Sequence, residues 1–156
     1  MLNCYVPGAQ GLTRLEPPPA NIPEACLWVD LLEPTLEEER AVERLLAIDV
    51  PSREEMREIE TSNRLYEEDG TLHMTANVVT KIDTERPESA AITFILTQNR
   101  LITNRYVDPL PFRHFLSYAE RHTAAAGSAL VILAGLLEAI IERTADVLER
   151  VGQDLD

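Results

Sequence analysis

The chain has 156 residues, of which 45% are hydrophobic and 26% charged, and these values are typical of one globular domain rather than a disordered or fibrous protein. The formal net charge of −13 disfavours nucleic acid as a partner, because nucleic acid is itself densely anionic. The longest apolar run, residues 129–137, is far shorter than the roughly 20 residues of a membrane helix, so we expect no membrane span in this chain.

Cysteine usage and the N-terminus both favour a reducing compartment. Cys4 and Cys26 lack the spacing of a zinc knuckle or of a Cys-x-x-Cys redox pair, and we expect them to be free thiols. The N-terminal residues lack the basic start and the apolar run of a signal peptide. The sequence therefore predicts a cytosolic location.

The N-terminal region is rich in proline. Residues 1–26 contain five prolines, and three consecutive prolines can continue neither a helix nor a central strand. We expect a short edge strand followed by a proline-rich linker. The apolar run LWVDL, which starts at Leu27 and precedes Pro34, predicts a buried strand with Trp28 in the core.

Two helices are expected next, each starting with a capping box. A Thr-x-x-Glu box at Thr35 predicts a helix over residues 36–48, whose apolar positions keep roughly helical spacing. A Ser-x-x-Glu box at Ser52 predicts a short second helix over residues 52–60.

The following segment has the pattern of strands. An Asp-Gly turn dipeptide predicts a hairpin over residues 64–83, and a short turn separates two further strand-like runs at residues 90–97 and 100–106. Their apolar character favours a sheet with at least one covered face. A third helix is expected over residues 112–122.

The longest periodic segment, residues 128–156, predicts an amphipathic helix. Its apolar side chains recur three and four residues apart, except for a longer step past Thr144, and this seam has no obvious partner in the chain. We therefore divide the chain into residues 1–26, an edge strand and linker, residues 27–126, an α/β domain, and residues 127–156, a C-terminal helix.

Acidic residues are concentrated in one region. Residues 33–69 hold 13 acidic and 5 basic side chains. Capping of helix starts explains many of these carboxylates without any ligand. The alternative is a divalent cation held by carboxylates, and magnesium suits this because it is bound by one or two carboxylates and keeps several waters.

A second acidic face is expected on the C-terminal helix, where Glu138, Glu142 and Asp146 recur every four residues. Like charges at this spacing repel one another by about 0.2–0.5 kcal/mol per pair. Arg150, four residues after Asp146, is expected to relieve part of this repulsion. The face is either simply solvated or contacts a cation or a basic partner surface.

The sequence offers no catalytic constellation. It contains no Gly-x-Ser-x-Gly elbow, no phosphate-cradling glycine loop and no Cys/His nucleophile pair. No Cys or carboxylate stands at ligand spacing around His73, His114 and His122, so we expect surface or packing histidines. We predict a protein that is not an enzyme and has no organic cofactor.

Four short segments occur in a characteristic order from about Leu27 to the C-terminus. They are a strand ending in WVDL, a helix closing with Ile48 and Asp49, an acidic REEM helix start, and the strand-turn-strand sequence ITFILTQNRLITNRY. In this order they resemble the N-terminal cytoplasmic domain of CorA-type divalent metal ion transporters.

The resemblance implies an α/β/α sandwich with a mixed, largely antiparallel sheet flanked by helices, plus a long C-terminal amphipathic helix. The family's stalk helix, two membrane helices and Gly-Met-Asn signature are not found in this sequence. We therefore expect an excised domain or a divergent soluble member, which would lie at the cytoplasmic face of the inner or plasma membrane and reach the membrane only through an absent C-terminal region.

The resemblance also implies assembly into a pentamer and a regulatory role, in which intracellular Mg²⁺ bound between cytoplasmic domains favours the closed channel. The family's sensor carboxylate best matches the pair Glu54-Glu55. We expect Glu55 to be the sensor carboxylate. Glu54 is the alternative, because a shift of the alignment by one residue around Val50 and Pro51 would place Glu54 at the same position. Related branches carry Zn²⁺, Co²⁺ or Ni²⁺, and the sequence does not assign the ion.

Two functional hypotheses from different classes follow. The first is the cytoplasmic regulatory domain of a CorA-like magnesium or divalent cation transporter, which senses ions and gates the pore without catalysis. The second is a free-standing soluble protein-interaction module on the same fold, which acts through its acidic surface and its final helix.

Overall fold

A seven-stranded mixed sheet forms the middle layer of the computed structural model, which describes residues 1–156. The strand order is β2-β1-β3-β7-β6-β5-β4, and every neighbouring pair is antiparallel except β3 with β7. The strands are β1 (Leu2–Pro7), β2 (Leu12–Arg14), β3 (Trp28–Leu32), β4 (Leu65–Glu68), β5 (Thr71–Thr80), β6 (Glu88–Leu96) and β7 (Leu101–Arg105).

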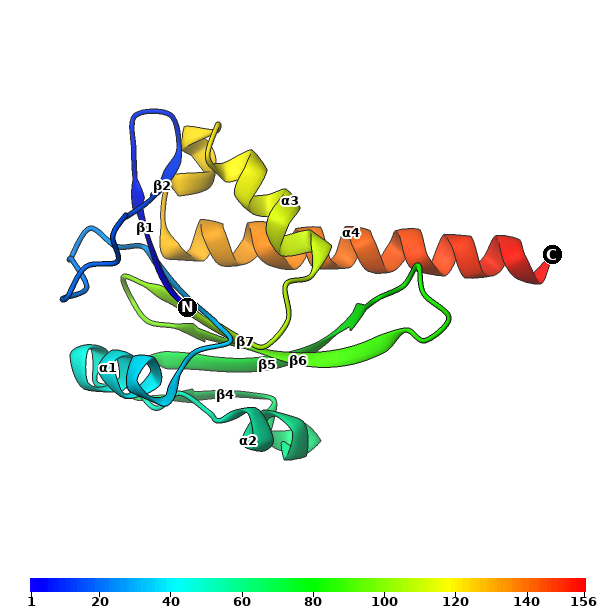
Figure 1. Cartoon of the computed structure of the whole chain (residues 1–156), viewed down its shortest axis with the longest axis horizontal. Coiled ribbons are helices and arrows are strands. Elements are labelled where there is room, and N and C mark those ends of the chain that lie inside the picture. The colour runs from blue at the N-terminus through cyan, green and yellow to red at the C-terminus, as the bar shows by residue number, and fades with distance from the viewer.

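Helices cover both faces of this sheet, as Figure 1 shows. One face carries α1 and α2, and the other carries α3 and the long α4, so the expected α/β/α sandwich with a long C-terminal helix is confirmed. The helices are α1 (Leu36–Leu46), α2 (Arg53–Glu58), α3 (Leu110–Ala119) and α4 (Ala129–Leu155), with short 3₁₀ turns η1 (Thr61–Asn63) and η2 (Thr123–Ala126). None of these helices is both long and apolar enough to cross a bilayer.

The alternation of side chains along the central strands creates two hydrophobic cores. Trp28 and Leu101 belong to the larger core under α3 and α4, whereas Val29 and Ile102 belong to the smaller core under α1. Trp28 is fully buried, as expected, and its ring stacks on that of Tyr5 with 4.6 Å between centroids. These central strands are therefore buried on both faces.

Both predicted capping boxes are present and set the starts of α1 and α2. The Thr35 hydroxyl accepts from the backbone N–H of Glu38, while the Glu38 carboxylate accepts from the backbone N–H of Thr35. The helix ends two residues earlier than expected, because Ala47 adopts a left-handed conformation with φ of 52°. In α2 the extended backbone of Ile59 ends the helix after Glu58.

The N-terminal region differs from its prediction. We expected one short edge strand in residues 1–26, followed by a linker. The structure has two strands there: β2 is the short edge strand, and β1 lies inside the sheet between β2 and β3. A tight turn in which the N–H of Gly8 donates to the carbonyl of Gly11 at 2.7 Å returns the chain for this pairing. Cys4 of β1 and Cys26, both free, are buried in the smaller core.

The long helix α4 has two halves with different surroundings. Leu133 of the apolar seam is buried in the larger core, and Leu137 and Ile140 pack against that core, so the expectation that the seam has no partner in the chain was wrong for this half. Gly135 allows the close approach, because a Cβ atom there would lie 2.4 Å from the Phe115 ring. The C-terminal half of α4 extends beyond the sheet (Figure 1), and Leu148 there is 67% exposed.

Candidate functional site

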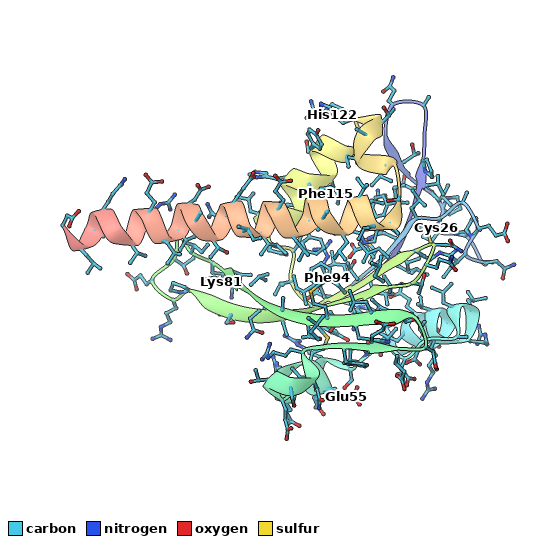
Figure 2. The ribbon with its side chains drawn as sticks, turned by 180° about the vertical axis from the view of Figure 1, so that it is seen from behind. Cys26, Glu55, Lys81, Phe94, Phe115 and His122 are labelled. Atoms are coloured by element: carbon cyan, nitrogen blue, oxygen red, sulfur yellow. The ribbon has the colours of Figure 1, made fainter.

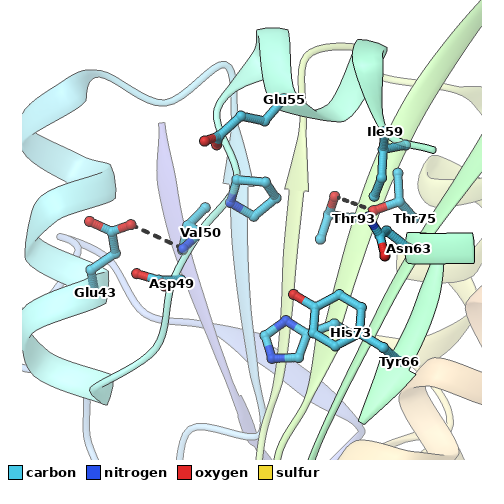
Figure 3. A pocket seen from close by; sticks show the side chains of 11 residues that line it. Glu43, Asp49, Val50, Glu55, Ile59, Asn63, Tyr66, His73, Thr75 and Thr93 are labelled. Carbon is cyan, nitrogen blue, oxygen red and sulfur yellow. Dashed lines mark hydrogen bonds between the residues drawn. The ribbon is translucent and has the colours of Figure 1, made fainter. Parts of the chain in front are cut away.

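The favoured site residue, Glu55, lines a cavity of about 650 Å³ between α1, α2 and the outer strands of the sheet. Figure 3 shows this cavity from close by. Its lining residues are Glu43, Asp49, Val50, Pro51, Glu55, Ile59, Asn63, Tyr66, His73, Thr75 and Thr93.

Three carboxylates from three consecutive segments line one part of this cavity. Glu43 comes from α1, Asp49 from the loop after it, and Glu55 from α2. Glu43 accepts a hydrogen bond from the N–H of Val50 at 3.0 Å, and Glu55 accepts one from the N–H of Ser52 at 2.7 Å. Two of the three carboxylates therefore hold the backbone of the α1–α2 segment in place and keep further lone pairs free.

Strand residues form the other part of the cavity. The hydroxyls of Thr75 and Thr93, which are buried side by side on β5 and β6, lie 2.9 Å apart. The His73 ring stacks on the Tyr66 ring with 4.7 Å between centroids and 3° between planes. In Figure 3 these rings lie across the cavity from Glu55. The cavity thus joins an acidic part to a part with hydroxyl and aromatic groups.

Burial lowers the pKa of His73 below its usual 6.5, although Glu68 and Asp49 act in the opposite direction. The unfolded chain then binds this proton more readily than the folded one, so the stability that His73 contributes is lost as pH falls below about 6.5. We expect an NMR titration of the three imidazoles, with His73→Gln for assignment, to give a His73 pKa below 6.5. A value at or above 6.5 would contradict this environment.

The structure separates the two carboxylates of the sequence-predicted metal pair. Both side chains are exposed, but Glu55 lines the cavity and Glu54 is not among its lining residues. No group of three or more His, Cys, Asp or Glu side chains in the chain is arranged to hold a metal ion. The ligand role of Glu54 and Glu55 stays a prediction, and the geometry brings only Glu55 together with other carboxylates.

The second predicted acidic face is exposed along its whole length. Glu138 and Glu142 border a groove between α3 and α4 that also contains His114, and Asp146 lies outside it. Arg150 does not offset the repulsion between Asp146 and its acidic neighbours, because Arg150 forms an ion pair with Asp83 of the β5–β6 loop at 2.6 Å. The long-range partner is thus preferred over the one four residues away on the same helix.

Sequence reasoning did not identify Glu43 or the Thr75–Thr93 pair as parts of this cavity. Glu43 lies on α1 in a run of acidic residues, and nothing in its spacing distinguishes it from its neighbours. The threonines lie on paired strands eighteen residues apart, and only the β5–β6 register brings them together. No local signal would have found either.

Comparison with known proteins supplies the context for this site. Residues 23–156 match the family model described as "CorA-like Mg2+ transporter protein". The magnesium transport protein CorA of Mannheimia succiniciproducens is 30% identical over 156 residues, which cover 100% of this chain and 49% of that protein. The corresponding protein of Escherichia coli K12 is 29% identical with the same coverage. The chain spans about half the length of these curated relatives.

Solved structures show the same fold. The complete CorA magnesium transporter from Methanocaldococcus jannaschii superposes with a TM-score of 0.73 at 15% identity, over 99% of this chain and 49% of that one. The ZntB cytoplasmic domain from Vibrio parahaemolyticus gives a TM-score of 0.67 at 14% identity, over 99% of this chain and 64% of that one. At this level of identity the structures show the likeness of the fold alone.

Proposed function

Since the chain belongs to the family of CorA-like Mg²⁺ transporter proteins, we propose that it is the cytoplasmic ion-sensing and gating domain of a magnesium or other divalent cation transporter. The single observation that carries the proposal is the family match over residues 23–156. The relatives named above are transport proteins, and no enzymatic role is proposed for this chain.

The charge distribution supports a role in cation sensing. Carboxylates that are held close together repel one another until a cation neutralises them, so cation binding can favour one arrangement of the chains over another. Glu43, Asp49 and Glu55 line one cavity on the face formed by α1 and α2. Magnesium fits a site with one or two carboxylates because it retains several of its waters.

No group of three or more His, Cys, Asp or Glu side chains in the single chain is arranged to hold a metal ion. We propose that a second copy supplies the remaining ligands, within a pentamer of the kind that the family resemblance implies. Residues 27–126 would then form the sensing domain at the cytoplasmic face of the membrane. Residues 127–156 would lead from this domain toward the stalk and pore. Mg²⁺ is the proposed ion, with Co²⁺, Ni²⁺ and Zn²⁺ as alternatives.

Charge-neutralising substitutions test the proposed ligands. Glu55→Gln retains a side chain that can complete the capping box, so it removes charge with little change to the start of α2. We expect MgCl₂ to raise the melting temperature more than NaCl of equal ionic strength, and Glu54→Gln/Glu55→Gln to lose most of this magnesium-specific rise. The matched control is Glu149→Gln/Asp154→Asn, two exposed carboxylates near the end of α4 that belong to neither predicted site and should retain it.

The outcome decides between the two hypotheses. A full magnesium-specific shift in a folded Glu54→Gln/Glu55→Gln variant would discard these residues as ligands. A wild-type protein that is insensitive to magnesium, and to the three alternative ions, would argue against the sensor. In that case the exposed apolar half of α4 would favour the protein-interaction module.

A further inference from the structure

A separate cavity of about 580 Å³ lies at one end of the sheet and extends from the start of α2, past the ends of β5 and β6, to the start of α3 and to α4 on the other face. Four basic residues from four different elements line it: Arg53 at the start of α2, Lys81 directly after β5, Arg113 in the first turn of α3, and Arg143 on α4. Figure 2 labels Lys81 at this end of the sheet, beside α4. This is more than a quarter of the 14 basic residues in a chain of net charge −13.

The carboxylates that border this cavity are already neutralised. Each forms an ion pair with a lysine or arginine: Glu88 with Lys81 at 2.9 Å, Asp108 with Arg105 at 2.9 Å, and Asp83 with Arg150 at 2.6 Å and with Arg143 at 3.7 Å. The two pairs of Asp83 connect the loop between β5 and β6 to α4. Each carboxylate that borders the cavity therefore already has a basic partner, and none of these partners is Arg53 or Arg113.

Two arginines of the cavity have no carboxylate partner. Arg113 forms no ion pair and no side-chain hydrogen bond. Arg53 lies with its guanidinium carbon 5.2 Å from the centre of the Tyr106 ring and also lacks a carboxylate. The stacking orients the Arg53 guanidinium and leaves its N–H donors available.

The start of α3 adds a further positive group. α1 and α2 begin with capping boxes and acidic first turns, whereas α3 has no side-chain cap at Pro109 and no acidic residue in its first turn. The N-terminus of a helix carries a partial positive charge, which attracts anions. In the first turn of α3 only the Leu110 N–H is free, because Pro109 and Pro111 have none and the Phe112 N–H donates to the Pro109 carbonyl. Pro109, Leu110, Pro111 and Arg113 from this helix start all line the cavity.

We propose that this cavity binds a small phosphorylated anion, with Arg53 and Arg113 as its ligands. The planar guanidinium fork matches two phosphate oxygens at once, which is why arginine suits this chemistry. The volume lies within the range of small-molecule sites, about 300–1,000 Å³. This cavity shares no lining residue with the cavity of Glu55. Because Arg53 directly precedes Glu54 on α2, Arg113 is the ligand whose substitution tests this site apart from the proposed cation sensing.

Pyrophosphate and ADP are the probes, titrated in metal-free buffer of constant ionic strength and followed by ¹⁵N-labelled amide NMR. We expect saturable shifts at the amides of Leu110 and Arg113, and about tenfold weaker binding for Arg113→Gln and for Arg53→Gln. The matched control is Arg40→Gln, an exposed arginine on α1, which should bind as the wild type does. If all three substitutions weakened binding equally, the loss would reflect the change in net charge alone, and the proposed site would be wrong.

A vesicle experiment separates a soluble phosphate from a lipid headgroup. We expect no difference in binding between phosphatidylcholine vesicles with and without phosphatidic acid. Binding to phosphatidic acid vesicles in the absence of any response to pyrophosphate or ADP would overturn the proposal. So would the absence of saturable shifts with both soluble probes.

Discussion

Arg105→Met is expected to destabilise the protein by about 3–5 kcal/mol, because it leaves a buried carboxylate without its counter-charge. Arg105 donates from Nε to Oδ1 of Asp30 at 2.9 Å and from Nη2 to Oδ2 at 2.8 Å. The side chains are 3% and 0% exposed. After the substitution Asp30 would keep only the hydrogen bond from the Thr103 hydroxyl, at 2.7 Å. Urea unfolding measures the cost.

Two further variants show whether this cost comes from the unpaired charge. Asp30→Leu/Arg105→Met removes both charges and should recover much of the lost stability, because replacing a whole buried pair by apolar residues is often nearly neutral. Arg14→Met breaks the exposed pair with Glu16 and should cost about 1 kcal/mol or less. If Arg105→Met lowered the free energy of unfolding no more than Arg14→Met, the buried pair of Arg105 and Asp30 would contribute no more to stability than an exposed pair, and the prediction would be wrong.

Gly11→Ala is expected to destabilise the protein by about 3 kcal/mol, from backbone strain and crowding together. Gly11 has φ of 149°, a conformation that side chains rarely adopt. A Cβ atom there would lie 2.1 Å from the carbonyl oxygen of Ala119 and 2.8 Å from the carbonyl carbon of Glu120. Both are backbone atoms at the end of α3, so they cannot move aside as a flexible side chain could.

Gly70→Ala is the matched control, because it separates the two contributions. Gly70 also has a positive φ, of 76°, but nothing lies within 4 Å of the position that a Cβ atom would take. Its substitution should therefore cost only the conformational strain, about 1–2 kcal/mol. Equal losses of melting temperature for the two variants would show that the β1–β2 turn does not pack closely on α3.

The helix starts and the hairpin were predictable because their signals are local. The hydroxyl of Thr35 bonds to a backbone group three residues away, and the Asp-Gly turn of β4 and β5 involves adjacent residues. The order of such segments was also sufficient for the family resemblance, which the match over residues 23–156 confirms. The family resemblance in turn predicted the three layers of the fold, with helices on both faces of a sheet.

Local sequence was sufficient to find the acidic pair of the predicted cation site but not to show which of its two residues lines a cavity. The sequence placed Glu54 and Glu55 together as an acidic pair at a helix start, and they are adjacent in the chain. Their side chains nevertheless have different surroundings, because only Glu55 lies beside the cavity that α2 forms with Glu43 and Asp49. Which of two neighbouring helix residues lines a cavity depends on how that helix packs on the sheet, and helix propensity does not specify this.

By itself the sequence determined the types of element, the acidic character of the chain and its family. Only the tertiary structure placed β1 inside the sheet, buried half of α4, and paired Asp30 with Arg105 across 75 residues. A carboxylate within the apolar run WVDLL indicates that a buried partner exists, since buried charges are rarely left unpaired. Which of the 14 basic residues is that partner depends on the parallel pairing of β3 with β7, because the register of two distant strands is a property of the folded chain.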